Sequence, residues 1–134
     1  DRLIVATTDN INKNYHFSID DRINIINNSL FKDLRLNKNK IKVISFADLT
    51  IDLCKKFNAG TIIRGLRAVS DFEYEFQLAG MNKKLNQNIE TMFLMSDVEN
   101  QIISSKFVKE IAALGGNIDK FVTKSTVKVL KNNF

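Results

Sequence analysis

The sequence predicts an α/β protein with a doubly wound parallel sheet. Strand-length apolar runs alternate along the chain with segments of helical spacing, and the runs are mainly apolar, without a strict alternation of apolar and polar residues. Strands that are buried between two layers of helices have this composition. The chain has 134 residues, which falls in the usual range of one domain. We therefore expect residues 1–134 to form a single domain.

Four strands are expected, at residues 3–6, 41–46, 61–63 and 92–95. The first helix is expected to begin at Ser18, because Ser18 and Asp21 nearly match a capping box.

The second helix is expected in ADLTIDLCKKFNAG, with Leu49, Leu53 and Phe57 on its packing face and Gly60 at its C-cap. Cys54 on this helix has no histidine placed to activate it, so we interpret it as a core residue and not a nucleophile.

The third helix is expected to begin at Ser70, with Glu73 completing a capping box. We expect Phe72 and Phe76 to anchor this helix to the core, with Glu75 on a different face. A fourth helix is expected in SSKFVKEIAALGG, ending at its two glycines, and a short last helix in STVKVLKNNF.

Composition narrows the classes of function. The chain carries 20 basic and 15 acidic residues, a net charge of +5, which suits anionic partners such as phosphorylated small molecules. A nucleic-acid-binding domain is the weaker alternative, because the sequence lacks a basic stripe with interleaved aromatics. No apolar run approaches the roughly 20 residues of a membrane span. A single cysteine excludes an intrachain disulfide, and a cytoplasmic protein is expected.

Basic and hydroxyl side chains follow three of the expected strands, where open α/β sheets bind their ligands. Lys13 lies in a loop, and Arg64 and Arg67 flank a glycine through which backbone N–H groups can approach a ligand. Forked guanidinium groups bind phosphate oxygens bidentately. Ser104 and Ser105 begin a helix whose free N–H groups suit an anion. Together these sites predict a polyphosphate ligand.

Each feature also has a purely structural interpretation. Arg67 could pair with Asp71, and Arg64 with a surface acid. The two serines could be plain helix caps, and Lys13 could be a solvated loop residue. The residues alone leave both interpretations open.

The run RGLRAVSDFEYEFQLAGMN resembles the most distinctive segment of bacterial phosphopantetheine adenylyltransferases. The resemblance continues through FSIDDR, FADLTIDLCKKFNA, MFLM and ISSKFVKEIAALGGNIDKFV, and so covers essentially the whole chain. It implies a Rossmann-like nucleotidylyltransferase that transfers the adenylyl group of ATP to 4′-phosphopantetheine, with Mg²⁺ as cofactor. It also implies a homohexamer, without a nucleic-acid or membrane partner.

The resemblance implies roles for individual residues. Lys13 and Arg64 match catalytic residues that hold the phosphate of phosphopantetheine, and Thr50 matches a backbone contact to its arm. The positions that match the ATP site are Gly65, Leu66, Arg67, Glu75, Asn100, Gln101, Ile102, Ile103, Ser104, Ser105 and Lys106. No residue is assigned to a metal. The sequence departs from the family at Asn100, where an aromatic is common, and at Lys106, where a small hydroxyl residue is common.

The HxGH signature of the family, carried between its first central strand and first helix, has no match in this sequence. His16 is no substitute, because it follows the second family strand and precedes no Gly-His pair. We expect the chain to be N-terminally incomplete by roughly 25 to 30 residues, and residues 1–134 alone to fold poorly and to lack activity. The alternative is a non-catalytic nucleotide-binding remnant of the same fold.

Overall fold

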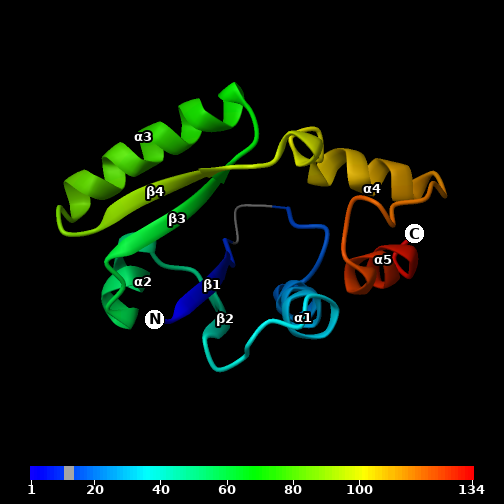
Figure 1. The fold of residues 1–134 in the computed structure, drawn as a ribbon, viewed down its shortest axis with the longest axis horizontal. Coiled ribbons are helices and arrows are strands. Elements are labelled where there is room, and N and C mark those ends of the chain that lie inside the picture. The colour runs from blue at the N-terminus through cyan, green and yellow to red at the C-terminus, as the bar shows by residue number, and fades with distance from the viewer. Residues whose placement is uncertain (11–13) are drawn as a thin grey trace. The chain divides into compact units, whose positions relative to one another are not determined.

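The computed structural model describes residues 1–10 and 14–134. Lys13 therefore lies outside the described residues. The chain divides into unit 1, residues 1–47 with 104–134, and unit 2, residues 48–103. Figure 1 labels the helices and strands of both units. The expectation of a single domain stays a prediction.

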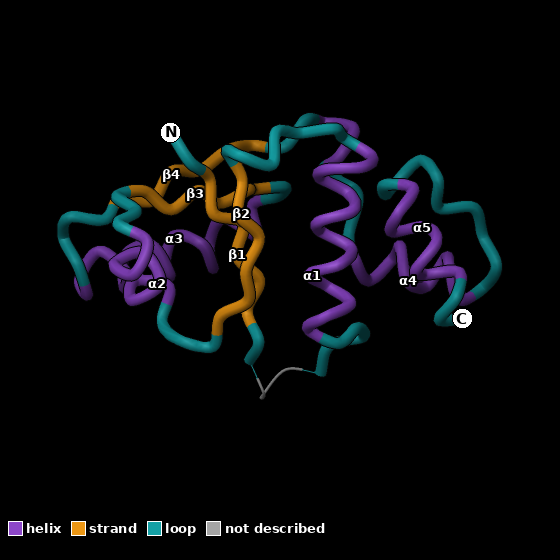
Figure 2. The backbone as a smooth tube through the Cα atoms, turned by 90° about the horizontal axis from the view of Figure 1, so that it is seen from below, coloured by secondary structure: helices purple, strands orange, loops and turns teal. Residues whose placement is uncertain are grey.

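Unit 1 contains a parallel pair of strands. β1 (Leu3–Thr8) pairs in register with β2 (Ile41–Phe46), so that Leu3 lies opposite Ile41 and Thr8 opposite Phe46. The two strands lie side by side in Figure 2. Their connection contains α1 (Ile19–Asn28), which contacts β2 and continues into the π-helical turn η1 (Ser29–Asp33). This β-α-β arrangement is the one expected for a parallel sheet.

The start of α1 confirms the capping prediction. Ser18 Oγ accepts a hydrogen bond of 3.1 Å from the N–H of Asp21 and donates one of 2.7 Å to Asp21 Oδ2. One of the free N–H groups of the first turn is thereby satisfied by a side chain.

The C-terminal part of unit 1 consists of α4 (Ser105–Ala113) and α5 (Lys124–Lys131), both close to the expected positions. Gly115, with φ of 76°, ends α4 as predicted. Asp33 Oδ2 accepts a hydrogen bond of 2.8 Å from the N–H of Ser125 at the start of α5. This backbone hydrogen bond is the main cause that lowers the pKa of Asp33.

Unit 2 contains the second parallel pair, β3 (Thr61–Leu66) with β4 (Glu90–Met95). The long helix α3 (Val69–Leu85) connects them and contacts both strands, and Figure 1 shows it running beside them. The helix α2 (Thr50–Phe57) precedes β3, and a 3-10 turn, η2 (Val98–Asn100), follows β4.

Parallel strands joined by helices confirm the predicted α/β class. The four strands of the described residues form two sheets of two strands each, one in each unit.

The core of unit 2 differs from the predicted packing face of α2. It is formed by Ile51, Cys54, Ile62 and Ile89, whereas Leu49 is 59% exposed. Leu49 is the N-cap and stands outside this core, because the helix begins only at Thr50. The buried position of Cys54 confirms that it is a core residue, and burial raises the pKa of its thiol.

The end of α2 was predicted at Gly60, but the helix ends at Phe57, and Asn58 adopts the left-handed conformation. Asparagine is the commonest substitute for glycine at this position. The local turn therefore needed no glycine.

The start of α3 also differs from the prediction. The N-cap of α3 is Ala68, whose φ and ψ are extended. No side chain forms a capping hydrogen bond at this position. Ser70 and Glu73 therefore lie too far along the helix to cap it. Asp71 in the first turn reaches back instead, and its Oδ2 accepts a hydrogen bond of 3.2 Å from the N–H of Arg67.

The buried face of α3 is polar. Glu75 and Asn82 are its buried residues, whereas Phe72 and Phe76 are exposed. The predicted anchoring by both phenylalanines is therefore wrong, although the Phe72 ring lies 6.2 Å from the Phe93 ring, centroid to centroid.

No helix within the described residues has the length and apolar character to cross a membrane.

Candidate functional site

Arg64 lies inside a strand and not in the loop after it. β3 extends three residues beyond the predicted end, and Arg64, Gly65 and Leu66 pair with residues 93–95 of β4. The extended backbone of a glycine is compatible with the ladder, so the hydrogen bonds continue through it. Arg67 is consequently the first residue past the strand.

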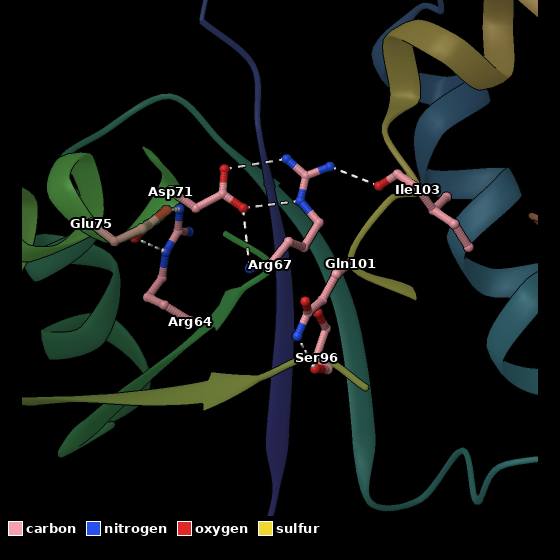
Figure 3. Close-up of polar contacts among 7 residues, drawn as sticks. All are labelled: Arg64, Arg67, Asp71, Glu75, Ser96, Gln101 and Ile103. Carbon is pink, nitrogen blue, oxygen red and sulfur yellow. Dashed lines mark hydrogen bonds and ion pairs between the residues drawn. The ribbon is translucent and has the colours of Figure 1, made fainter. Parts of the chain in front are cut away.

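The Arg64 side chain points toward α3 and binds Glu75 with two hydrogen bonds. Nε donates to Oε2 at 2.7 Å and Nη2 donates to Oε1 at 2.5 Å, as Figure 3 shows. The Glu75 side chain is only 11% exposed, whereas that of Arg64 is 44% exposed. The hydrogen bonds that Arg64 donates to Glu75 raise the pKa of Arg64 still further, so the guanidinium stays charged.

The position of this pair follows from the alternation of side chains along a strand. Arg64 shares a face of β3 with Ile62 and Leu66, which are both buried. α3 packs on the strand, and its second turn brings Glu75 within reach of the guanidinium. A buried carboxylate is costly unless it is paired, and Arg64 pairs with both of its oxygens.

Arg67 forms a second network at the start of α3. Its Nε donates to Asp71 Oδ2 at 3.0 Å and its Nη2 to Asp71 Oδ1 at 3.3 Å. Its Nη1 donates to the backbone carbonyl of Ile103 at 2.8 Å. The hydrogen bonds from Arg67 are the main cause that lowers the pKa of Asp71. Arg67 therefore ties the start of α3 to the end of the loop that follows β4 (Figure 3).

This geometry confirms that Arg67 pairs with Asp71, the alternative that the sequence left open. The Arg67 side chain is 43% exposed, so part of the guanidinium faces solvent.

Gly65 lies between the two arginines with open space beside it. A Cβ built on it would meet no atom within 4 Å. Packing within the described residues therefore does not require glycine here, which leaves close approach of a ligand as a reason for it.

The segment from residue 100 to residue 103 belongs to unit 2. Asn100 is the last residue of η2, and Gln101 Nε2 donates to the carbonyl of Ser96 at 3.4 Å. Ile102 is exposed, and Ile103 accepts the hydrogen bond from Arg67. These contacts place the segment at the C-terminal end of β4.

The remaining positions matched to the ATP site belong to unit 1. Ser104 is the N-cap of α4, and its Oγ accepts a hydrogen bond of 3.3 Å from the N–H of Phe107. The predicted capping is thereby confirmed. Ser105 and Lys106 are the first two residues of the helix and are exposed. Their contact with a phosphate stays a prediction.

Thr50 is the first residue of α2, after the extended Leu49, and is partly buried. A backbone N–H in the first turn of a helix lacks an intrahelical partner, which suits the predicted backbone contact. Lys13 lies outside the described residues.

Arg22 in α1 is a polar centre that the sequence did not reveal. Its Nη1 donates to Thr7 Oγ1 at 3.2 Å and to the carbonyl of Thr8 at 2.8 Å, and its Nη2 lies 3.6 Å from Asp9 Oδ1. Its guanidinium carbon lies 3.8 Å from the centre of the Tyr15 ring. Arg22 joins α1 to the C-terminal end of β1, a long-range contact without a local sequence signal.

Comparison with known proteins places this site in a family. A family model described as cytidylyltransferase-like matches residues 1–111. A phosphopantetheine adenylyltransferase of Pelagibacter ubique is 64% identical over 134 residues, which cover 100% of this chain and 82% of the relative. The chain belongs to the phosphopantetheine adenylyltransferase family. The membership confirms the resemblance first seen in the segment with both arginines.

More distant phosphopantetheine adenylyltransferases match over nearly the same length. That of Sphingopyxis alaskensis is 46% identical over 130 residues, covering 97% of this chain and 75% of the relative. The phosphopantetheine adenylyltransferase of Vesicomyosocius okutanii is 47% identical over 132 residues, which cover 98% of this chain and 80% of the relative. The similarity to this family therefore extends over both units.

Proposed function

We propose that the protein transfers the adenylyl group of ATP to 4′-phosphopantetheine, giving dephospho-coenzyme A and pyrophosphate. The observation that carries the proposal is the identity of 64% over the whole chain to a relative with this name. A phosphate oxygen of 4′-phosphopantetheine attacks the α-phosphorus of ATP and forms a P–O bond. The bond from that phosphorus to the pyrophosphate oxygen breaks, and no covalent enzyme intermediate is formed.

Such a reaction depends on two bound phosphates held in line and on cations near the charge that develops. Arg64 is the proposed ligand of the phosphate of 4′-phosphopantetheine. Its guanidinium is held by Glu75 and remains 44% exposed, so it offers free N–H groups in a fixed orientation. Lys13 and Thr50 are the other proposed contacts to this substrate.

The proposed ATP site includes Arg67 and the backbone of Gly65. Arg67 is anchored by Asp71 and Ile103, and the space beside Gly65 is open. A charged guanidinium and an accessible backbone suit a polyphosphate. The other proposed ATP contacts are Leu66, Glu75, Asn100, Gln101, Ile102, Ile103, Ser104, Ser105 and Lys106.

Mg²⁺ is proposed as the cofactor that balances phosphate charge when bound. No group of three or more His, Cys, Asp or Glu side chains among residues 1–10 and 14–134 could hold a metal ion. These residues thus do not form a protein cage for Mg²⁺, and the ion would be held largely through the phosphates of ATP. The roles of the side chains above do not depend on it.

The activity is tested with the purified product of the complete coding region. Incubation with ATP, 4′-phosphopantetheine and Mg²⁺ should release pyrophosphate and form dephospho-coenzyme A. Binding of ATP without either product would contradict the proposal and favour a non-catalytic nucleotide-binding protein.

The ATP site is tested by calorimetry with ATP and Mg²⁺. Arg67→Ala should weaken ATP binding by about 10- to 100-fold, because a charge-assisted hydrogen bond is lost. Arg2→Ala removes an exposed arginine near the N-terminus and serves as the matched control. Equal ATP affinity of both variants would remove Arg67 from the site.

The cytoplasmic setting and the homohexamer are part of the proposal. Sedimentation velocity on the same protein measures the oligomeric state, and a monomer at micromolar concentration would contradict the hexamer.

A further inference from the structure

Arg22 of α1 holds the C-terminal end of β1. Its Nη1 donates to Thr7 Oγ1 at 3.2 Å and to the backbone carbonyl of Thr8 at 2.8 Å. Its Nη2 lies 3.6 Å from Asp9 Oδ1, and its side chain is only 16% exposed. These three partners are consecutive in the chain, and Thr7 and Thr8 are the last two residues of β1. One guanidinium on the helix therefore fixes the point at which the chain leaves the strand.

The same guanidinium also contacts Tyr15, which lies further along the chain. The guanidinium carbon is 3.8 Å from the centre of the Tyr15 ring, which is within the range of a cation–π contact. Tyr15 Oη and Arg22 Nε are buried, and neither has a hydrogen-bond partner among residues 1–10 and 14–134. The face of the ring, and not its hydroxyl, therefore makes this contact.

Arg22 thus holds both ends of the segment that connects Asp9 to Tyr15. Five residues, 10–14, lie between these ends, and Lys13 is one of them by its position in the sequence. Because both ends contact one side chain, they are kept close to each other and to α1. Fixing the ends of a short segment reduces the number of conformations that it can adopt.

We propose that Arg22 is a positioning residue, which acts on 4′-phosphopantetheine only through the segment that it holds at both ends. The proposal rests on the proposed function, in which Lys13 contacts this substrate. Arg22 is not itself a substrate ligand, because Nη1 is occupied by two acceptors, Nη2 faces a carboxylate and the side chain is largely buried.

The physical argument is that the segment is ordered before the substrate arrives. A segment with free ends loses conformational entropy when a ligand immobilises it, and this loss weakens binding. Contacts that hold its ends in advance reduce the loss. Arginine suits this role because its planar fork can donate hydrogen bonds at its edge while its face stacks on an aromatic ring. A lysine carries the same charge but cannot do both.

Arg22→Lys tests this role by keeping the charge and removing the fork. We expect kcat/KM for 4′-phosphopantetheine to fall about 10- to 100-fold, as misplaced binding groups do. The KM for ATP should stay within about twofold of the wild-type value, because the proposed ATP contacts lie in other segments. Equal losses for both substrates would overturn the proposal, since a purely structural role of Arg22 predicts no preference between them.

Variants of Tyr15 test the other end of the segment. Tyr15→Leu removes the aromatic face and should lower kcat/KM for 4′-phosphopantetheine in the same direction as Arg22→Lys. Tyr15→Phe keeps the face and loses only the unpaired hydroxyl, so it should largely retain the wild-type value. The matched control is Arg2→Lys at an exposed arginine, which should leave all constants unchanged. Similar losses for Tyr15→Phe and Tyr15→Leu would contradict the contact through the ring.

A double-mutant cycle tests whether Arg22 acts through Lys13. In a Lys13→Ala background, adding Arg22→Lys should lower kcat/KM for 4′-phosphopantetheine little further. Losses that multiply independently would overturn the proposal. Urea unfolding of each variant first establishes conditions under which all of them are folded. If Arg22→Lys does not fold, Tyr15→Leu takes its place in the cycle.

Limited proteolysis provides a measurement that does not depend on activity. Trypsin cleaves after lysine, and mass spectrometry identifies the product cut after Lys13. Under folding conditions, this cut should be about tenfold faster in Arg22→Lys and in Tyr15→Leu than in wild type and Arg2→Lys, because local opening controls cleavage of a folded chain. Equal rates would overturn the proposal even if the enzyme is active. If wild type shows no transfer, the proposed function fails, and the cleavage rates still decide the role of Arg22.

Discussion

Arg64–Glu75 and Arg67–Asp71 are ion pairs of the same chemistry in different surroundings. The two arginine side chains are almost equally exposed, at 44% and 43%. The carboxylates differ, because Glu75 is 11% exposed and Asp71 27%. Glu75 lies 11 residues along the chain from Arg64, on the helix α3 that packs against β3. Asp71 lies only four residues from Arg67, in the first turn of α3.

The difference separates a tertiary pair from a local one. Attraction between charges is stronger, and removal of one partner costlier, where the carboxylate is shielded from water. The local pair is set by the start of α3, where Asp71 also accepts the backbone N–H of Arg67. We therefore expect the loss of Arg64 to lower the free energy of unfolding more than the loss of Arg67, because the Glu75 carboxylate is the less exposed of the two partners.

The largest effect on stability is expected for Arg64→Ala. The variant leaves the Glu75 carboxylate shielded without its partner, which typically costs about 1 to 3 kcal/mol. Because the Arg64 side chain is 44% exposed, solvent screening should bring the loss toward the lower end of that range. Urea unfolding at neutral pH measures the difference in unfolding free energy from wild type.

Arg67→Ala is the comparison for this experiment. Its carboxylate partner is more exposed and can be solvated after the arginine is removed, so a smaller loss is expected. Equal losses for the two variants would show that carboxylate burial does not distinguish the pairs.

A smaller effect, dependent on pH, is expected for Asp71→Asn. The pKa of Asp71 is lowered from its usual value of 3.8, chiefly by the hydrogen bond from the Arg67 side chain. A lowered folded-state pKa adds stability that is fully present above 3.8 and is lost as pH falls through the folded-state value. Wild type should therefore exceed Asp71→Asn in unfolding free energy at neutral pH, and the two should converge below that window.

Urea unfolding of both proteins between acidic and neutral pH measures this convergence. Asp33→Asn is the companion variant in unit 1, because the N–H of Ser125 lowers the pKa of Asp33 in the same direction. A difference between wild type and Asp71→Asn that stays constant at acidic pH would contradict the role of ionised Asp71.

The smallest effect on stability is expected for Gly65→Ala, between the two arginines. The added Cβ would meet no atom within 4 Å, so the unfolding free energy should change by less than about 1 kcal/mol. If ATP approaches this backbone, calorimetry should still show weaker ATP binding. The matched control is Gly80→Ala on α3, which also has open space and should leave ATP affinity unchanged. Equal ATP affinity in both variants would remove Gly65 from the site.

The pattern of elements was predictable because each depends on neighbouring residues. Apolar runs located all four strands, and serines located the starts of α1 and α4. Predictions of helix ends failed where more than one neighbouring residue could start or end the helix. Asn58 took the left-handed position expected of Gly60, and α3 began at Val69 ahead of Ser70.

The faces of the helices were less predictable than their positions. α3 carries apolar residues on several sides, and the structure buries Glu75 while leaving Phe72 and Phe76 exposed. Hydrophobicity alone favours the opposite arrangement. Glu75 is paired there with Arg64 on the adjacent strand, a partner that no periodicity within the helix can reveal.

The sequence by itself determined the α/β class and the family. It also offered the local pair of Arg67 with Asp71 as one of two interpretations of Arg67. These follow from short-range patterns and from a segment of distinctive residues. Only the tertiary structure decided that Arg64 faces Glu75, that Arg22 joins α1 to β1, and that Ile51 and Cys54 form the core of unit 2. The physical reason is that these contacts arise when a helix packs on a strand, and packing selects partners by distance in space.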